Sequence, residues 1–373
     1  MTHLYGENID SRPEKAKQTP ENESAAFIAD DHAGCRSLML TERCAMRKVA
    51  IGMPVWNGEK FVSEAIESIL GQTYGDFELI ISDNASTDAT AEICRGYVEQ
   101  DTRIRYFRQT KNIGAGPNHA EVFRLSAGRY FKWACHDDIL APEFIDECVR
   151  ALDADEAVAV CCPATVLINE DGSPLRYSPQ LDGMVDAHGN LWRVTENMPL
   201  TSADPAERFA AVLCNMDWCF EIYGLIRRSA LARASAMPSY YGGDKVLLAE
   251  LSLLGRYHLL EAPLLHRRCH PAQSSSPQTS RYRAMWISGR RIQLVPPQLR
   301  LVAGYLQAVL WAKLTPVQRL RCLSAIGRRA VTIGLRGHVV DHRHPRNHPE
   351  IQSSAAPAEI KRAADLLARA RNL

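Results

Sequence analysis

Short apolar segments alternate with amphipathic helical segments from Lys48 onward, and this alternation constrains the fold more than any other feature of the sequence. The pattern predicts strands at residues 49–56 and 103–110, a strand that ends in polar loop residues within 77–87, and a strand that runs into an acidic loop within 129–140. It predicts helices at residues 59–72, 87–100 and 114–127. Strands that alternate with helices of this length favour an α/β fold with a mainly parallel sheet and helices on both of its faces. Ligands of such sheets bind beyond the carboxyl ends of the strands.

The second half of the chain continues this pattern less regularly. We expect a strand at 157–165, a helix at 205–215, a strand turning into a helix at 221–231, and a helix, a strand and a histidine-containing loop across 242–270. Residues 170–200 contain Gly, Pro and Asn without a clear period, so they are expected to form a loop-rich excursion.

The first 46 residues differ in composition from the rest. They are rich in Glu, Asp, Ser, Thr and Lys without sustained periodicity, which predicts a disordered tail. Met46 stands directly before the first predicted strand and is an alternative translation start, which an N-terminal peptide would identify.

Composition places the chain among ordinary globular proteins. It is 46% hydrophobic and 23% charged, and its formal net charge of +1 gives no overall attraction to nucleic acid, so we expect no nucleic-acid partner. The eleven cysteines are odd in number and contain no C-x-x-C pair, which predicts reduced thiols, most of them in the core. We find no signal-peptide pattern and no run of about 18 apolar residues, so we expect a cytoplasmic protein without a transmembrane helix.

Polar residues cluster where four predicted strands end. The clusters are PVWNGE at 54–59, SDNASTD at 82–88, KNIGAGPNHA at 111–120 and CHDD at 135–138. A nucleotide diphosphate sugar needs an acceptor for the N–H of its base, hydrogen bonds to its ribose and a divalent cation at its phosphates. Asp83 can accept from a pyrimidine ring, and Asp137 and Asp138 offer the hard oxygen ligands that suit Mg²⁺ or Mn²⁺.

These residues resemble the catalytic domain of the family 2 inverting glycosyltransferases, which have the GT-A fold. The resemblance rests on PVWNGE, the helix AIESILGQTY at 65–74, SDNASTD, NIGAGPN and the final HDDIL. It is clear from Val49 to about Pro142 and weaker through YGLIRRSAL and GGDKVLLAEL to about residue 275. It implies a GT-A domain at 47–275, with a nucleotide-binding half at 47–142 and an acceptor half at 143–275, followed by a helical basic extension at 276–373.

The resemblance also implies a set of site residues. A divalent cation, Mg²⁺ or Mn²⁺, is expected on Asp137, with His270 as a metal or phosphate contact. The expected nucleotide-binding residues are Pro54, Val55, Asn57, Glu59, Asp83, Asn84, Asn112, Gly114, Asn118 and Asp138.

One position departs from the family pattern. Members of the family commonly carry D-x-D-D in the acidic loop, whereas this chain has C-H-D-D with Cys135 at the first position. The aspartate aligned with the metal ligand, Asp137, is retained, but the carboxylate that would contact the ribose is missing.

An inverting transfer needs a base for the proton of the acceptor hydroxyl. The resemblance places this role on Asp244, in YYGGDKVLLAEL. The alternative for Asp244 is simple capping of the helix that follows Gly243.

Other residues also keep structural alternatives. Asp88 fits an N-cap at least as well as a substrate contact, and Asn112 and Gly114 fit turn geometry as well as nucleotide binding. His270 also fits a surface loop. Arg267 and Arg268 can pair with phosphate, although a solvated face is expected for at least one of them.

The C-terminal region is locally basic. Residues 286–347 contain eleven Lys or Arg and a single acidic residue, Asp341. Because apolar and basic positions alternate at helical spacing, these segments either lie peripherally on an anionic membrane, at its inner face, or pack on the catalytic domain as basic helices.

The expected function is transfer of a sugar, UDP-linked, to the hydroxyl of a glycan or lipid-linked acceptor in polysaccharide or glycolipid biosynthesis. The alternative is a non-catalytic nucleotide-sugar-binding protein of the same fold, a reading that the Cys135 departure favours. An oxidoreductase of the Rossmann type would carry G-x-G-x-x-G after the first strand, where this chain has GMPVWNGE. The Gly-rich basic loop of a nucleotidyltransferase is also missing from that position.

Overall fold

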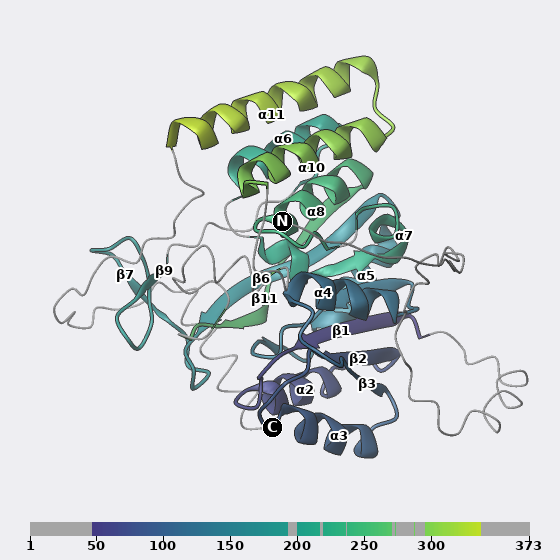
Figure 1. Cartoon of the computed structure of the whole chain (residues 1–373), viewed down its shortest axis with the longest axis vertical. Coiled ribbons are helices and arrows are strands. Elements are labelled where there is room, and N and C mark those ends of the chain that lie inside the picture. Colours follow the sequence, from purple (N-terminus) through teal and green to yellow (C-terminus); the bar gives the residue numbers. More distant parts are fainter. Residues whose placement is uncertain are drawn as a thin grey trace, which may run out of the picture. The chain divides into compact units, whose positions relative to one another are not determined.

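An eight-stranded sheet forms the centre of the part of the chain that the structure describes (Figure 1). The computed structural model describes residues 47–192, 200–216, 219–235, 237–270, 273, 287 and 295–336. The predicted tail at 1–46 lies outside these residues, as do parts of the predicted basic extension.

The strand order is β3-β2-β1-β4-β10-β6-β11-β5. The strands are β1 (Val49–Val55), β2 (Phe77–Asp83), β3 (Ile104–Arg108), β4 (Tyr130–Trp133), β5 (Ile139–Leu140), β6 (Val158–Ile168), β10 (Leu225–Arg227) and β11 (Arg256–Arg268). Four of the seven neighbouring pairs are parallel, and the antiparallel pairs all involve the short strands β5 and β10. The sheet is therefore mainly parallel, as predicted.

Helices cover both faces of this sheet. One hydrophobic core lies against α2 (Val62–Leu70), α3 (Thr90–Gln100) and α5 (Phe144–Ala154). The core on the opposite face lies against α4 (Ala115–Arg124), α6 (Pro205–Asn215) and α8 (Gly243–Leu254). A 3₁₀ turn (Phe220–Tyr223) and the short helix α7 (Arg228–Leu231) flank β10.

The first strand shows how the sequence builds both cores. Val49, Ile51 and Met53 point into one core, while Ala50 points into the other, because successive side chains of a strand alternate between its faces. Gly52 lets α4 approach closely, since a Cβ at this position would lie 2.7 Å from a methyl carbon of Val122.

The predicted loop-rich excursion contains a second, three-stranded sheet. Its strands are β7 (Arg176–Ser178), β8 (Gly183–Val185) and β9 (Leu191–Trp192), paired antiparallel. Strands of two and three residues are too short to show a period in the sequence, which explains why the prediction missed them.

Two C-terminal helices complete the described fold. Helix α10 (Pro297–Trp311) packs on α8, and α11 (Pro316–Arg336) packs on α6 and α10 (Figure 1). Their inner faces belong to the same core as α6 and α8, through Leu301, Tyr305, Val309 and Ile326 among others. Within the described residues, no helix combines the length and the hydropathy needed to cross a bilayer.

Candidate active site

The polar clusters named from the sequence meet at one edge of the sheet. The strands β1, β2 and β4 run parallel, so the loops after Val55, Asp83 and Trp133 leave from the same edge. Strand β11 runs parallel to β6, and its end at Arg268 brings His270 to this edge.

Reciprocal hydrogen bonds join the loops after β1 and β2. The Asn57 side chain accepts from the backbone N–H of Thr87 at 2.9 Å, and Glu59 accepts from that of Ala89 at 2.9 Å. In return, Asp88 accepts from the backbone N–H of Glu59 at 3.1 Å. The predicted nucleotide residues Asn57 and Glu59 therefore use side-chain oxygens to hold the loops together.

Asp88 also serves the start of α3. Its carboxylate accepts from the backbone N–H of Thr90 at 3.1 Å, although the N-cap position itself is Ala89. The N-cap alternative for Asp88 is thus wrong by one residue, although its side chain accepts a hydrogen bond at the start of the helix.

The asparagines of the second and third clusters bind each other. Asn84 donates to the side-chain oxygen of Asn112 at 3.0 Å, and Asn118 exchanges two hydrogen bonds with Ser82. Gly114 is the N-cap of α4 with a φ of 91°, a conformation that favours glycine. These contacts give each of the four residues a structural role. Nucleotide binding by the same residues stays a prediction.

Asp83 lies at the end of β2 with no exposed surface. Its carboxylate accepts from the Ser86 backbone N–H at 2.8 Å and from the Tyr106 hydroxyl at 2.6 Å. The Arg108 guanidinium also pairs with this carboxylate, at 3.9 Å. Recognition of a base N–H by Asp83 stays a prediction. Pro54 and Val55, at the end of β1, are buried beside Asp83.

The acidic loop after β4 meets the loop after β11. The imidazole Nε2 of His270 lies 3.0 Å from the Asp137 carboxylate, across 133 residues of sequence. The Asp138 carboxylate accepts from the backbone N–H of Arg268 at 3.0 Å. The structure thus brings together the two residues predicted as metal contacts.

Neighbouring charges shift the pKa values of Asp137 and Asp138 in opposite directions. Burial alone would raise the pKa of Asp137, but the adjacent His136 and His270 outweigh it and hold that pKa below the usual range. Burial and the charge of Asp137 raise the pKa of Asp138. Asp137 is therefore the carboxyl group of the pair that ionises more readily.

Cys135 joins this group as a neutral thiol. Its sulfur lies within 4.8 Å of carboxylate oxygens of Asp137 and Asp138. Burial first, and then the two neighbouring carboxylates, raise the pKa of the thiol well above its usual value. Cys135 therefore contributes no negative charge at the position where the D-x-D-D pattern has its first carboxylate.

The donor set fits a divalent cation. Two ligands about 2.1 Å from an octahedral ion lie about 3 Å apart, which matches the separation of Asp137 and His270. The carboxylate is a ligand suited to Mg²⁺ and to Mn²⁺, and the imidazole adds a nitrogen ligand.

Arg268 holds the acidic loop in place. It is 1% exposed and donates to the backbone oxygens of Asp137 and Glu170 and to the Glu64 carboxylate, the last at 2.5 Å. These contacts tie the end of β11 to the acidic loop and to Glu64 of α2. The expectation of a solvated face for one of the two arginines is wrong for Arg268.

Arg267 faces the acidic loop from the other side. Its guanidinium stacks on the rings of Phe220 at 4.7 Å and Tyr223 at 5.4 Å. Burial opposes its charge, but Tyr223 and Asp138 outweigh this effect and raise the pKa of Arg267. A permanent cation is therefore held beside Asp137 and Asp138 by two aromatic rings.

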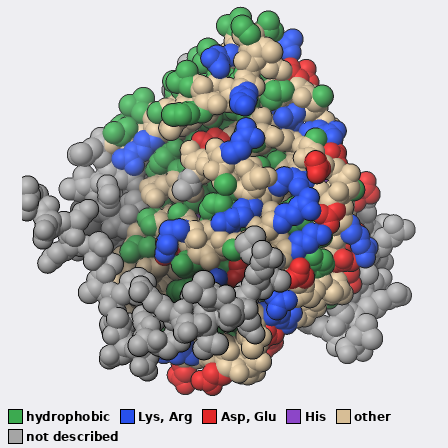
Figure 2. All heavy atoms as spheres, turned by 90° about the vertical axis from the view of Figure 1, so that its right-hand side faces the viewer, with side chains coloured by type: hydrophobic (Ala, Val, Ile, Leu, Met, Phe, Trp, Pro, Cys, Tyr) green, Lys and Arg blue, Asp and Glu red, His purple; other side chains and the backbone are tan. Residues whose placement is uncertain are grey.

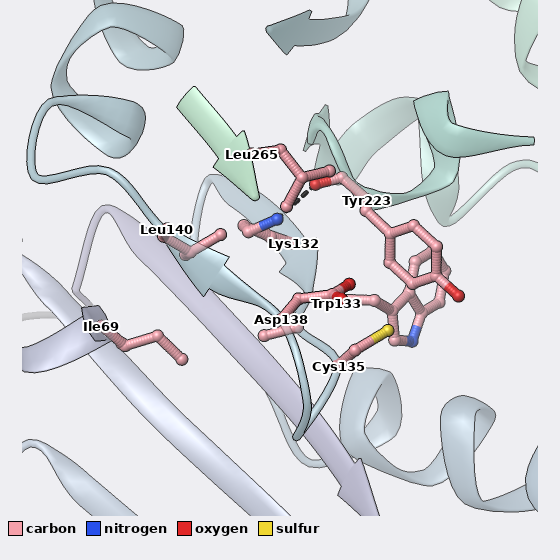
Figure 3. A pocket seen from close by; sticks show the side chains of 9 residues that line it. Ile69, Lys132, Trp133, Cys135, Asp138, Leu140, Tyr223 and Leu265 are labelled. Carbon is pink, nitrogen blue, oxygen red and sulfur yellow. Dashed lines mark hydrogen bonds between the residues drawn. The ribbon is translucent and has the colours of Figure 1, made fainter. Parts of the chain in front are cut away.

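Lys132, which no sequence motif singled out, lines a small cavity beside the acidic loop. Figure 3 shows Lys132 with Cys135, Asp138 and Tyr223 among the residues that line this space. Its volume of about 10 Å³ holds a single water at most, so it is not a sugar site. Lys132 has no exposed surface and donates to the Tyr223 carbonyl, which ties β4 to the segment before β10.

Asp244 lies in the first turn of α8. The N-cap is Gly242 with a φ of 80°, so Asp244 is inside the helix and is not the cap. Its carboxylate accepts from the Lys245 backbone N–H at 2.8 Å and is hydrogen-bonded by the Cys219 thiol. Burial raises the pKa of Asp244 above the usual value of an aspartate.

Residues 50–220 match the family model described as Glycosyl transferase family 2. These residues form a family 2 glycosyltransferase domain. This match covers the four strand-end clusters, the acidic loop among them, and bears out the resemblance in that part of the sequence; it ends before Asp244 and His270.

Curated glycosyltransferases align with part of this chain. An uncharacterized glycosyltransferase of Rickettsia felis is 36% identical over 132 residues, which is 35% of this chain and 21% of that protein. Chondroitin synthase of Escherichia coli is 31% identical over 155 residues, 42% of this chain and 21% of that protein. The glycosyltransferase thus matches about a fifth of the length of each of these relatives.

Solved structures share the fold at low identity. TarS residues 1–349 of S. aureus, in complex with UDP-GlcNAc, superpose with a TM-score of 0.52 at 14% identity, covering 76% of this chain and 73% of that chain. With the family match, this likeness confirms the predicted GT-A fold.

Proposed function

We propose that this glycosyltransferase moves a sugar from a UDP-linked donor to an acceptor hydroxyl with inversion at the anomeric carbon. The observation that carries this proposal is the pairing of Asp137 with His270 beside the cation Arg267, at the sheet edge where the strand-end loops meet. This arrangement offers ligands for a divalent cation and a positive side chain for a diphosphate.

The donor diphosphate would lie against this group. Asp137 and His270 would hold a divalent cation, Mg²⁺ or Mn²⁺, and Asp83 would accept from the uracil N–H. A bound cation neutralises the charge that develops on the leaving diphosphate. Arg267, fixed by its two aromatic neighbours, would stabilise the same charge.

Transfer itself requires a base near the acceptor. The acceptor oxygen bonds to the anomeric carbon as the bond from that carbon to the diphosphate oxygen breaks, and the hydroxyl proton passes to Asp244. The raised pKa of Asp244 makes its carboxylate a better proton acceptor than an ordinary aspartate. The acceptor that we propose is a glycan or lipid-linked sugar, in polysaccharide or glycolipid synthesis in the cytoplasm.

The test measures UDP affinity and UDP release from donor sugars, with Mn²⁺ and with EDTA. Asp137→Asn should weaken Mn²⁺-dependent UDP binding by about tenfold or more, because a desolvated charge contact is lost. Asp182→Asn is the matched control, since Asp182 is an exposed turn residue with a positive φ that asparagine adopts readily. Equal UDP affinity of wild type and Asp137→Asn, or full activity in EDTA, would remove the metal from the proposal.

The same assay separates binding from chemistry at Asp244. Asp244→Asn keeps the shape of the side chain but cannot take the proton, so UDP affinity should persist while turnover falls by ~10²- to 10⁴-fold. In the wild type, turnover should rise as pH increases through the raised pKa of Asp244. A variant with near-normal turnover would exclude Asp244 as the base, and donor binding without turnover in the wild type would favour the non-catalytic alternative.

A further inference from the structure

Exposed apolar side chains are concentrated in one C-terminal region of the protein, around the helices α10 and α11. Every Val, Leu, Ile, Met, Phe, Tyr or Trp side chain that is exposed in the described part of the chain lies between residues 295 and 331. They are Val295, Leu299, Leu306, Leu310, Trp311, Val317, Leu320, Leu323 and Val331. We call this set, which lies on α10 and α11 and, at Val295, just before α10, the outer face of the hairpin.

The outer face is distinct from the face that packs on the catalytic domain. On α10, Leu301, Tyr305 and Val309 are buried in the core, whereas Leu299, Leu306 and Leu310 follow helical spacing on the opposite side. Leu310 and Trp311 are 69% and 81% exposed at the C-terminal end of this helix. The helix is therefore apolar on both sides, and only one side has a partner within the protein.

All charged residues of the hairpin are basic. Residues 295–336 contain seven Lys or Arg and no Asp or Glu. Figure 2 shows green hydrophobic side chains, with some blue basic side chains among them, at the top of the molecule, the end at which α11 lies in Figure 1. Lys313 and Arg328 are exposed beside the apolar residues.

We propose that the outer face of the hairpin docks on an anionic membrane surface, with the apolar residues among the lipid headgroups and the basic residues on the phosphates. Helices of this composition lie in the plane of the membrane interface, where burial of apolar area and attraction to anionic lipid add together. A second copy of the chain fits the face less well, because it would bring a surface of the same positive sign against it.

This contact would also orient the active site. A Cβ on Gly242, the N-cap of α8, would lie 2.9 Å from Leu301, so α10 touches the start of the helix that carries Asp244. A hairpin docked through its outer face would then hold the acceptor half at a fixed orientation to the membrane. This inference extends the proposed function, but its test depends on neither donor nor acceptor.

The test is co-sedimentation of the full chain with vesicles. Wild type should bind vesicles of phosphatidylglycerol and phosphatidylcholine, and bind pure phosphatidylcholine much more weakly. Each basic residue near an anionic surface strengthens binding about fivefold, so Lys313→Glu with Arg328→Glu should weaken it by more than about tenfold. The matched control is Arg124→Glu with Arg150→Glu, which reverses two exposed arginines on α4 and α5.

The apolar contribution is tested separately with Leu310→Gln and Trp311→Gln, residues whose side chains are mostly exposed. This pair should lower vesicle binding while the melting temperature and UDP affinity stay at wild-type values. Equal vesicle binding by wild type and both pairs of variants would overturn the proposal. So would a dimer in the absence of lipid that Leu310→Gln with Trp311→Gln converts to a monomer, because the face would then bind a second copy.

Discussion

Lys132 stands in β4 between the buried residues Phe131 and Trp133 and has no exposed surface itself. Its ammonium group donates to the Tyr223 carbonyl and lies 4.1 Å from the centre of the Phe144 ring. Burial lowers the pKa of Lys132 to about 8, because the charged form loses its water. Below that pH the buried Lys132 is charged in the folded protein, and this charge lowers the free energy of unfolding.

This cost predicts a pH-dependent difference between wild type and Lys132→Met. Between about pH 8 and 10.5 the unfolded chain binds a proton on Lys132 that the folded chain does not, so folding stability rises with pH across this interval. The free energy of unfolding of wild type should gain ~3 kcal/mol relative to Lys132→Met between neutral pH and about pH 10. Urea titrations at both pH values measure it, and a constant difference between the two proteins would contradict the prediction.

Individual site residues were predictable where they belong to a local motif. Asp137 follows a buried strand and precedes Asp138, a pattern that identifies an acidic loop. The role of Arg268 was not predictable, because its partners Glu64 and Glu170 lie 204 and 98 residues away. The sequence also gives no sign that Asn84 and Asn112 bind each other, since both residue types fit loops equally well.

At the scale of elements, the strands and helices of the first half follow the predicted pattern. Each runs long enough for a period of two or of 3.6 residues to appear, and burial on one or both faces enforces that period. Helix starts were less predictable. At α8 the alternative to a catalytic role for Asp244 was capping of the helix, whereas the chain enters the helix through Gly242 in a left-handed conformation.

Two glycines in helical regions should respond oppositely to alanine. Gly242 has a φ of 80°, and a Cβ there would lie 2.9 Å from Leu301, so Gly242→Ala should lower the free energy of unfolding by ~1–2 kcal/mol. Gly327 lies inside α11 with no atom within 4 Å of an added Cβ, so Gly327→Ala should raise it by up to ~1 kcal/mol. Urea unfolding of both variants tests this, and equal effects would mean that Gly242 is not strained by a side chain.

At the scale of the whole molecule, the sequence left open where the C-terminal helices lie. Their mixed apolar and basic sequence fitted packing on the catalytic domain as well as a membrane surface. The structure shows the packed face, with Leu301, Tyr305 and Val309 in the same core as α6 and α8. A single sequence could not separate the two, because both sides of α10 carry apolar residues and hydropathy does not reveal which side has a partner.

The packed face predicts that the catalytic domain needs the hairpin to fold. Deleting residues 295–373 removes Leu301, Tyr305, Val309 and Ile326 from the core and exposes the apolar sides of α6 and α8. Full burial of one such side chain contributes about 1.5–3 kcal/mol, so their combined loss is comparable to the 5–15 kcal/mol of net stability typical of a domain. The deletion variant should therefore aggregate on expression, whereas deleting residues 337–373 leaves the hairpin in place and should keep the melting temperature of wild type. Soluble yield, thermal unfolding and UDP affinity of the two variants decide between a folding role and a detachable extension. If the longer deletion were soluble and bound UDP as wild type does, the hairpin would be detachable, and its inner face would contribute little to the core in which it lies.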